Sequence, residues 1–244
     1  MERVIYDRLR ALESTHWWFT ARRKLIGQAI ETCGLPANAR ILEAGCGTGG
    51  NIELLRRFGT VRAMEPDAVS RAYIGETYGL EVDDGLLPAG LPYAPGSFDL
   101  VCAFDVIEHV DDDGASLRSL GELLAPGGVL MVTVPAYQWM WSHHDELHHH
   151  KRRYTRGEFV RVVEGAGLSV AKATYFNTVL LPLAVGVRMT KRTLGLKSED
   201  DRMPPPWLNR LLGGVFAAEA PLIRKGALPL GLSILVTAGR PQAA

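Results

Sequence analysis

Five of the chain's seven histidines lie in one polar stretch, SHHDELHHHKRRYT, at residues 142–155. An imidazole titrates near neutral pH and is the commonest metal ligand, so this stretch could move protons or hold a cation. If the stretch is helical, His144 shares a face with His148, and Asp145 shares one with His149. Neither pair has a third ligand at a spacing typical of zinc sites. We therefore predict a pocket lining in which His144 accepts a proton; a solvated loop, an internal hydrogen-bonded brace and a metal site are the alternatives.

A second group of ionisable side chains, DVIEH at residues 105–109, directly follows an apolar, strand-like segment. In an open α/β sheet, residues just beyond the carboxyl end of a strand lie where ligands bind. His109 is therefore predicted to take a proton from an acceptor hydroxyl, because the ordinary pKa of an imidazole is near neutral pH. Asp105, Glu108 and His109, at i, i+3 and i+4, could instead bind a divalent cation. The structural alternative is that Glu108 and His109 only brace the next helix.

The glycine-rich stretch EAGCGTGG, at residues 43–50, fits two cofactor fingerprints at once. Glycines let the backbone approach a ligand closely, and a helix that follows them presents free N–H groups. The dinucleotide pattern G-x-G-x-x-G is met with Glu65 twenty residues further on. Its glycines are Gly45, Gly47 and Gly50. The pattern E/D-x-G-x-G-x-G of methyltransferases is met by Glu43, Gly45, Gly47 and Gly49.

Glu43 favours the second fingerprint. A carboxylate before the first glycine suits the ammonium group of a methionine moiety and would sit poorly beside a pyrophosphate. Glu65 would then take the two ribose hydroxyls of an adenosine. We therefore predict S-adenosylmethionine as the cofactor, with nicotinamide binding, or a tight turn that binds nothing, as the alternatives.

The apolar pattern places these groups in alternating strands and helices. Predicted strands cover residues 40–45, 60–64, about 80–82, 97–104, 129–134, 168–176 and 228–239. Predicted helices cover about 3–33, 51–58, 67–79, 115–124 and 156–166, with a turn at APGG, residues 125–128. This alternation is typical of a parallel, doubly wound sheet. Residues 177–228 interrupt it with two apolar helical runs joined by SEDDRMPPP, which predicts a helical insertion before the final strand.

Composition excludes several classes of protein. The chain of 244 residues has 47% hydrophobic residues and no net charge, which argues against a general polyanion binder and predicts no nucleic-acid partner. Cys33, Cys46 and Cys102 show no C-x-x-C spacing, as expected of a reduced protein without disulfides. The N-terminal residues show no apolar signal core, and the longest apolar run, residues 179–187, is too short to span a bilayer. We expect a cytoplasmic protein that is soluble or peripheral at the inner face of a membrane.

Two further stretches join the glycine turn in a family pattern. LPYAPGSFDLV (91–101) and LLAPGGVLMVTVP (123–135) closely resemble class I S-adenosylmethionine-dependent methyltransferases, over about residues 40–175. The resemblance implies an α/β, Rossmann-like sheet of seven strands whose last strand is antiparallel, and LGLSILVTAG would supply that strand. It also implies transfer of a methyl group.

The resemblance implies which residues contact the cofactor. The methionine end would meet the glycine turn, the ribose would meet Glu65, and the adenine would lie near Pro66. Many relatives place an aspartate after the glycine at Gly85; here that position is Leu86, so backbone contacts are expected there, and Asp84 is a possible substitute. The predicted cofactor residues are Trp18, Arg22, Glu43, Gly45, Cys46, Gly47, Gly49, Glu65, Pro66, Gly85, Leu86 and Phe104. For Trp18 and Arg22, on the N-terminal helix, core packing is the alternative.

Residues after the fifth predicted strand would line the acceptor site. The aromatic residues alternate and suggest a wall for a bulky acceptor, and the basic ones suit an anionic group. The predicted acceptor residues are Tyr137, Trp139, Trp141, His143, His144, His148, Arg152, Arg153 and Tyr154. His149 and His150 are treated as the most expendable.

The whole chain resembles a bacterial subgroup of these enzymes. HWWFTARR, FDVIEHVDDD, VPAYQWMWSHHDELHHHKRRYT and LPLGLS carry this likeness, and members often accompany genes of lipid-linked sugar metabolism. We expect one domain, 1–244, made of a helical cap (1–37), a cofactor-binding core (38–176), an insertion or lid (177–228), and a final strand with its tail (229–244). The expected reaction is O-methylation of a small or lipid-linked acceptor; N- or C-methylation and a non-catalytic binding protein are the alternatives.

The insertion could also serve assembly. Its first apolar run ends at Arg188, Lys191 and Arg192, which could meet anionic headgroups while the run lies in the membrane interface. Packing on the sheet, or on a second copy in a homodimer, is the alternative.

Overall fold

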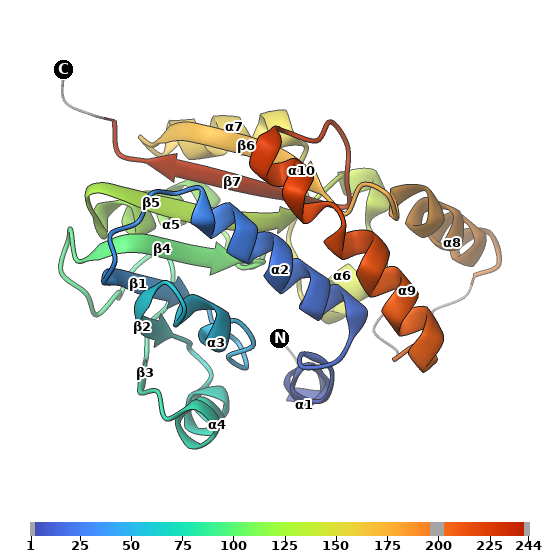
Figure 1. Ribbon diagram of the computed structural model, residues 1–244, viewed down its shortest axis with the longest axis horizontal. Helices are drawn as coiled ribbons and strands as arrows, with labels where there is room; N and C mark the ends of the chain where they lie inside the picture. The colour runs from blue at the N-terminus through green and yellow to red at the C-terminus, as the bar shows by residue number, and fades with distance from the viewer. Residues whose placement is uncertain (1–2, 196–202, 242–244) are drawn as a thin grey trace.

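The computed structural model describes residues 3–195 and 203–241, and a seven-stranded sheet lies at its centre (Figure 1). The strand order is β3-β2-β1-β4-β5-β7-β6. Neighbours from β3 to β5 run parallel, whereas β7 runs antiparallel to both β5 and β6. The strands are β1 (Ala39–Ala44), β2 (Gly59–Met64), β3 (Val82–Asp83), β4 (Phe98–Phe104), β5 (Leu124–Pro135), β6 (Ser169–Phe176) and β7 (Ser233–Gly239). The predicted fold class is confirmed.

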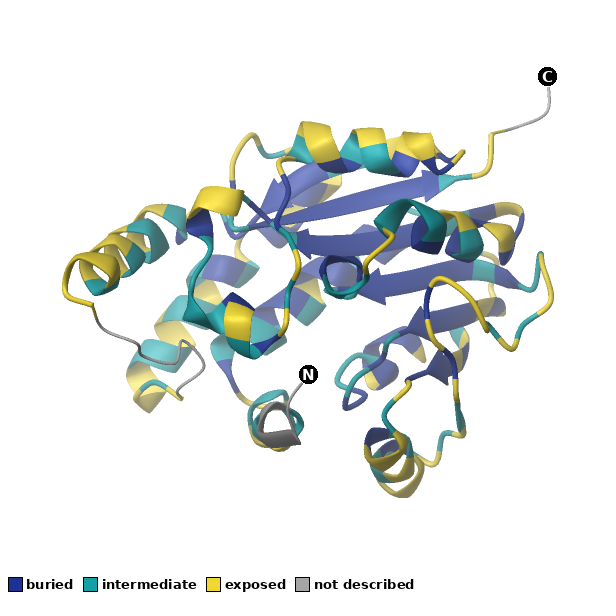
Figure 2. Ribbon diagram, turned by 180° about the vertical axis from the view of Figure 1, so that it is seen from behind, coloured by how far each residue is buried: buried dark blue, intermediate teal, exposed yellow. Residues whose placement is uncertain are grey.

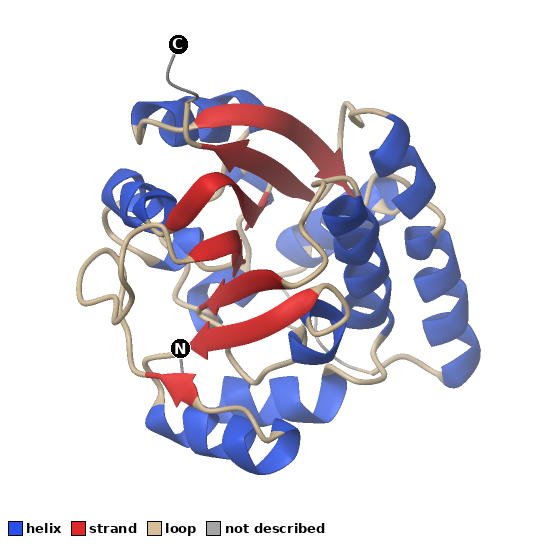
Figure 3. Ribbon diagram, turned by 60° about the vertical axis from the view of Figure 1, so that its left-hand side comes forward, coloured by secondary structure: helices blue, strands red, loops and turns tan. Residues whose placement is uncertain are grey.

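Helices cover both faces of the sheet (Figure 3). Successive strand residues point to opposite faces, so each central strand contributes side chains to two hydrophobic cores, one on each face of the sheet. Leu42 and Val101 pack on the face that α5 and α7 cover, whereas Ile41 and Leu100 pack under α2, α9 and α10. Accordingly the central strands are buried almost throughout (Figure 2). These helices are α2 (Trp17–Glu31), α5 (Asp113–Glu122), α7 (Arg156–Gly165), α9 (Pro206–Ala217) and α10 (Ala220–Lys225).

The N-terminal segment forms two helices, so the prediction of one helix over 3–33 is wrong. Helix α1 (Arg3–Leu12) ends before a break at residues 13–16, and α2 then begins at Trp17. The side chain of His16 accepts a hydrogen bond from the Trp18 N–H at 3.3 Å and so caps α2. Ser and Thr within this break favour local backbone hydrogen bonds over helix, which the apolar periodicity did not reveal.

Two turns, at opposite ends of β4, also differ from expectation. The residues DVIEH form a short 3₁₀ turn, η1 (Ile107–His109), instead of an α-helical start. The APGG segment lies within β5, where Phe98 pairs with Leu124 but Leu100 pairs with Val129. The extra residues between those pairs bulge from the ladder, and Gly127 takes the positive φ of 77° that the bulge needs. The helices that contact β2 and β3 are α3 (Ile52–Leu55) and α4 (Ala68–Tyr78), respectively.

Residues between β6 and β7 form α8 (Leu181–Thr193), α9 and α10, as the predicted helical insertion requires. Asn209 of α9 accepts a hydrogen bond from the Trp17 N–H at 2.8 Å and donates one to the Thr15 carbonyl at 2.9 Å. The ring of Phe216 packs edge-on against Trp17, so α9 is fixed to the start of α2. Residues 198–202, the first part of the predicted polar link, lie outside the described residues.

Helix α8 differs from its neighbours because none of its residues is buried within the described structure. It projects beyond the carboxyl ends of the parallel strands (Figure 1). In the described part of the chain, no helix combines the length and the apolar character that a membrane crossing needs.

Candidate functional site

The glycine turn follows β1 with the geometry that a cofactor loop requires. Gly45, Gly47 and Gly49 all have positive φ, at 68°, 58° and 87°. A Cβ on Gly45 would lie 2.8 Å from Val106, so glycine is also required there by packing. A Cβ on Gly47 would meet no atom of the described residues within 4 Å, so the turn is open at its centre. This is the predicted place for the methionine end of a cofactor.

Glu43 lies under this turn and is buried. Its Oε1 accepts a hydrogen bond from Asn51 Nδ2 at 2.8 Å, but Oε2 has no hydrogen-bond partner among the described residues. Burial raises its pKa to about 7, although Asn51 and the charge of Arg22 act in the opposite direction. An unpartnered buried carboxylate oxygen is costly, and an ammonium group would compensate it.

Arg22 extends from α2 to the same edge of the sheet. Its Nη2 forms an ion pair with Asp105 Oδ2 at 2.6 Å and donates to Thr133 Oγ1 at 2.9 Å. The guanidinium lies 4.9 Å from the Trp18 ring centroid and 5.6 Å from that of Phe104. Its buried Nε has no partner in the described part of the chain. Arg22 thus braces α2 against β4 and retains a donor that suits a carboxylate, such as that of methionine.

Glu65, at the end of β2, is buried with both carboxylate oxygens hydrogen-bonded. Oε2 accepts from the Gly47 N–H at 2.9 Å, and Oε1 accepts from the Asp67 N–H and the Tyr6 hydroxyl, both at 3.1 Å. Burial raises its pKa, and these hydrogen bonds lower it. The predicted ribose residue therefore lies directly beside the glycine turn, with α1 across it.

The remaining predicted cofactor residues differ in how far they are buried. Cys46 is buried within the turn, and burial raises its pKa well above the ordinary value, as expected of a structural thiol. Gly85 is buried against Met64, whereas Pro66 and Leu86 are exposed near it. Asp84, the possible substitute for an adenine-binding aspartate, is exposed and pairs with Arg71 at 3.2 Å.

A group of potential metal ligands lies at the same edge. One ligand atom each from Glu108, His109 and His150 lies within 4.8 Å of the others. The cation site considered from the sequence contained Asp105, Glu108 and His109. Asp105 does not belong to the observed group, because its carboxylate pairs with Arg22. The cause is the backbone, because Asp105 has a positive φ of 55° and precedes a 3₁₀ turn, so helical spacing does not apply.

Four histidine rings form a continuous cluster around this group. The centroids of His109 and His150 are 4.7 Å apart, and those of His144 and His148 are 4.1 Å apart. The His150 centroid lies 5.7 Å from that of His148, which joins the two pairs. The short helix α6 (His143–Leu147) supplies His144, the turn that follows it supplies His148 and His150, and the 3₁₀ turn η1 after β4 supplies His109. The sequence analysis treats His150 as expendable, but its ring lies between those of His109 and His148 and joins the cluster.

His109 is in a poor environment for its predicted role. Burial and the neighbouring His150 and His148 lower its pKa to about 3. An imidazole with so low a pKa is neutral at pH 7 but is a weak proton acceptor. His143, by contrast, lies outside the cluster and contacts Glu146 at 3.0 Å.

The basic residues that follow α6 hold the loop together, which favours the brace over the predicted acceptor site. Arg153 is buried, and its Nε and Nη2 contact the two oxygens of Asp145 at 2.7 and 3.0 Å. Arg152 Nη1 and the Tyr154 hydroxyl both donate to Asp113 Oδ2, at 3.1 and 2.8 Å. All three predicted acceptor contacts are thus engaged within the chain.

The predicted aromatic wall is present in part. Tyr137, at a positive φ of 60°, stacks on Trp139 with ring centroids 5.5 Å apart and on Tyr175 at 5.3 Å. Trp139 is 52% exposed, although it is a large apolar side chain, and Trp141 is half-buried. A short 3₁₀ turn, η2 (Gln138–Met140), carries Trp139.

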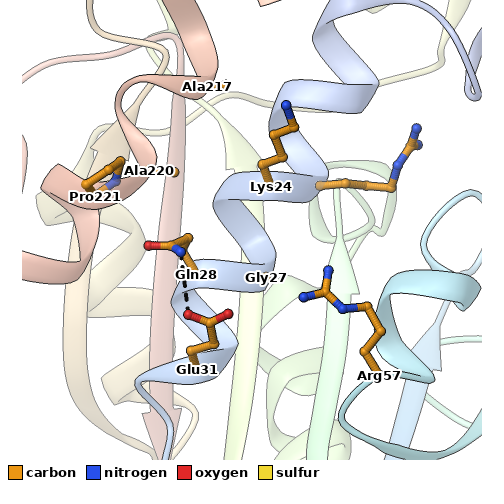
Figure 4. A pocket seen from close by; sticks show the side chains of 9 residues that line it. Lys24, Gly27, Gln28, Glu31, Arg57, Ala217, Ala220 and Pro221 are labelled. Atoms are coloured by element: carbon orange, nitrogen blue, oxygen red, sulfur yellow. Dashed lines mark hydrogen bonds between the residues drawn. The ribbon is translucent and has the colours of Figure 1, made fainter. Parts of the chain in front are cut away.

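A hollow of about 330 Å³ lies elsewhere, on the outer side of α2 (Figure 4). Lys24, Gln28 and Glu31 of α2 line it together with Arg57 and the start of α10, and Gln28 contacts Glu31 at 3.5 Å. None of its lining residues is a predicted site residue, so it is separate from the glycine turn and the histidine cluster.

The sequence did not predict three residues that contact the site: Tyr6, which meets Glu65, Asn51, which meets Glu43, and Asp145, which meets His150. Tyr6 meets Glu65 across 59 positions, and no local pattern could reveal that contact. Asn51 follows the glycine turn directly and, as a polar residue at a helix start, offered a signal. Asp145 was considered only as a partner of His149, whereas it contacts His150.

The sheet order with an antiparallel β7, the glycine turn and the acid under it define a class I S-adenosylmethionine-dependent methyltransferase architecture. The family model described as a methyltransferase domain matches residues 18–173. The chain belongs to this family, and its cofactor is S-adenosylmethionine. The unpartnered oxygen of Glu43 and Nε of Arg22 fit the ammonium and carboxylate groups of that cofactor.

Relatives and solved structures agree with this family. Ubiquinone biosynthesis O-methyltransferase of Caulobacter sp. (strain K31) is 39% identical over 101 residues, which cover 38% of this chain and 39% of the relative. A probable S-adenosylmethionine-dependent methyltransferase of Mycolicibacterium smegmatis is 28% identical over 163 residues, covering 65% of this chain and 62% of the relative. The matches thus span only part of these curated relatives.

A solved structure shows the same fold over nearly the whole chain. It is the complex between the Trm112 methyltransferase activator of Haloferax volcanii and a candidate methyltransferase, with a TM-score of 0.63 and 17% identity, covering 99% of this chain and 96% of that one. At this identity the likeness concerns the fold alone.

Proposed function

We propose that the protein transfers a methyl group from S-adenosylmethionine to a hydroxyl of a small or amphiphilic acceptor. The observation that carries the proposal concerns Glu43, whose buried Oε2 has no hydrogen-bond partner among the described residues. A cationic group bound beside the open glycine turn would compensate this carboxylate. The cofactor supplies a methyl group on a positively charged sulfur. O-methylation is favoured by the similarity to the Caulobacter ubiquinone biosynthesis O-methyltransferase, over the matched region.

The donor side of the site would be built from five side chains and the turn. Glu43 and Arg22 would hold the amino acid end, and Glu65 would take the ribose hydroxyls. Trp18 and Phe104 flank Arg22 and would exclude water around it. Catalysis would then rest mainly on alignment of the two reactants in a site from which water is excluded.

Proton removal is assigned to His144. It is half-buried and lies at the cluster's edge, beside His148, at the carboxyl edge of the sheet. His109 is the alternative from the sequence, but its low pKa weakens it as a base. The acceptor would approach along Tyr137 and Trp139, whose stacked rings offer an apolar surface next to these histidines.

A lipid-linked acceptor and a peripheral membrane contact belong to the same proposal. Helix α8 leaves Val179, Leu183 and Val187 exposed around its start and middle, and its last turn carries Lys191 and Arg192. An apolar face with a basic end suits an interface with anionic lipid. A homodimer through this face is the competing arrangement.

Methyl transfer can be tested with methyl-labelled S-adenosylmethionine and a lipid extract from the host. Label should enter an organic-soluble product, and Glu65→Ala should weaken binding of S-adenosylhomocysteine by about 1–3 kcal/mol, the cost of stranding buried polar partners. Glu122→Ala, exposed at the end of α5, is the matched control and should change neither result. Tight binding of a nicotinamide dinucleotide without binding of S-adenosylhomocysteine would contradict the proposal.

A further inference from the structure

We propose that Glu108, His109 and His150 bind a divalent transition-metal ion at the edge of the sheet. Their three ligand atoms come from the turn after β4 and from the turn after α6, and they converge within 4.8 Å. Metal–ligand bonds of about 2.1 Å allow two ligands of one ion to be at most about 4.2 Å apart, so small side-chain movements would bring the three atoms into one coordination sphere.

Glu108 provides the first argument. Its side chain is fully buried, and neither carboxylate oxygen has a hydrogen-bond partner in the described part of the chain. The nearest cations are already engaged, because Arg22 pairs with Asp105 and Arg153 pairs with Asp145. A buried carboxyl group without a partner is rare and costly, and a bound cation would offset that cost.

His150 provides the second argument. Its Nδ1 contacts Asp145 Oδ1 at 2.8 Å, so that nitrogen carries the proton and Nε2 is left as the ligand atom. Asp145 is itself fixed by Arg153 and by the Ser142 N–H at 2.8 Å. A carboxylate that orients an imidazole in this way is the usual support behind a metal-binding histidine.

His109 is oriented in a similar manner. Its imidazole is hydrogen-bonded to the backbone of His148, which leaves one ring nitrogen for a metal. The two turns that carry the ligands are also joined, because the Lys151 N–H donates to the Glu108 carbonyl at 2.7 Å. The three ligand positions are therefore held in place by contacts that do not use the ligand atoms.

The donor set indicates the class of metal. Two imidazoles and one carboxylate suit Zn²⁺, Mn²⁺, Fe²⁺ or Co²⁺, whereas Mg²⁺ prefers oxygen ligands alone. Three protein ligands also leave at least one coordination position open, as in catalytic zinc sites. Nothing about this site depends on the identity of the methyl acceptor.

A possible use of the ion rests on the proposed function. If an acceptor hydroxyl occupied the open position, the cation would lower the pKa of that hydroxyl and so favour its deprotonated form. His144 would then accept the released proton.

Direct metal binding tests the site without any methyl-transfer assay. Metal-depleted full-length protein is titrated by calorimetry with Zn²⁺ and, separately, with Mn²⁺, and S-adenosylhomocysteine binding is measured on the same samples. One ion should bind per chain, and Glu108→Gln and His150→Ala should each weaken binding at least about a hundredfold. Asp145→Asn should weaken it by about 10–100-fold, as is usual for a residue that supports a ligand.

His149→Asn is the matched control. It removes an exposed imidazole one position from His150, and asparagine tolerates the positive φ of 57° found there. This variant should keep wild-type metal affinity, and thermal unfolding checks that each variant folds. Zn²⁺ affinity that is unchanged in Glu108→Gln, or the absence of stoichiometric binding in the wild type, would overturn the site. Loss of methyl transfer with metal binding retained would count against the proposed function only.

Discussion

The hydroxyl of Tyr6, in α1, donates a hydrogen bond of 3.1 Å to Glu65, the carboxylate predicted to hold the cofactor ribose. The same oxygen, Oε1, also accepts from the Asp67 N–H, and Oε2 accepts from the Gly47 N–H. Two ribose hydroxyls would need acceptors on these same oxygens. If Glu65 holds the ribose, helix α1 would compete with it through Tyr6.

Tyr6→Phe should strengthen binding of S-adenosylhomocysteine. Removal of the competing donor frees one acceptor position on Glu65, and a hydrogen bond of this kind contributes about 0.5–1.5 kcal/mol, so the gain is expected to be from about twofold to about tenfold. Calorimetry measures it. Weaker binding in Tyr6→Phe would mean that Tyr6 holds Glu65 ready for the cofactor and does not compete with it.

Cofactor affinity should fall as the pH is lowered below about 7. Burial raises the pKa of Glu43 to about 7, with Arg22, Glu13 and Glu65 as the charged groups that act on it. The ionised carboxylate is the form that pairs with an ammonium group, so a pKa above the ordinary value means that binding must first remove a proton at lower pH. The affinity for S-adenosylhomocysteine should therefore decrease by up to about tenfold per pH unit below 7.

Glu43→Gln is the control for this pH dependence. Glutamine keeps the shape of the side chain and its contact with Asn51 but cannot titrate, so the profile should be flat between pH 5 and about 7 apart from the contribution of Glu65. An unchanged slope in this variant would place the titrating group elsewhere.

His144→Ala should lower turnover far more than it lowers cofactor affinity. A lost general base typically reduces the rate by about a hundredfold or more. His144 lies in α6 with its ring against His148, and it is not among the residues predicted to hold the cofactor, so its loss should leave S-adenosylhomocysteine binding nearly unchanged. Turnover is measured with labelled cofactor on an acceptor extract. Wild-type turnover in His144→Ala would make this histidine structural.

His109→Ala separates the two roles discussed for that residue. If His109 is a metal ligand, its loss should abolish metal binding together with turnover, whereas loss of a simple base would leave metal binding intact. Activity that survives exhaustive chelation would show that the ion, if bound, is not needed for the reaction.

The local sequence predicted which residues lie together around the glycine turn. Glu43, the glycines and Glu65 lie at the ends of two neighbouring strands, so their spacing along the chain already determines that they meet. The near-continuous apolar runs of β1 and β4 likewise predict a sheet buried on both faces. These features depend on backbone geometry within a few residues.

The histidine half was predicted less well, because its contacts join distant segments. Asp105 pairs with Arg22 across 83 positions, a contact that removes it from the expected cation site. Arg153 meets Asp145 in a buried pair, although the sequence predicted Arg153 in the acceptor site and Asp145 on a helical face with His149. His150 meets His109 only because the two turns are adjacent in space. Each of these contacts depends on how distant segments pack in the fold, and the periodicity of the sequence contains no information about that packing.

Substitution of the exposed face of α8 tests the membrane contact proposed for this helix. Leu183 and Val187 are 57% and 44% exposed, and the basic side chains of Lys191 and Arg192 lie in the last turn. Arg188 has a different role, because it donates to the Met140 carbonyl and ties α8 to the turn beside the histidine cluster. It is therefore left unchanged in the test.

Leu183→Glu with Val187→Glu should abolish sedimentation with anionic liposomes at low salt, because it removes the apolar face and adds negative charge. Lys191→Gln with Arg192→Gln should weaken sedimentation by an amount that disappears at high salt, since contacts with anionic headgroups are screened. Neutral liposomes are the matched lipid control. Wild-type protein that stays in the supernatant at low salt rules out the membrane contact. If the same wild-type protein elutes as a dimer and the Leu183→Glu, Val187→Glu variant elutes as a monomer, the α8 face is instead an interface between two copies of the chain.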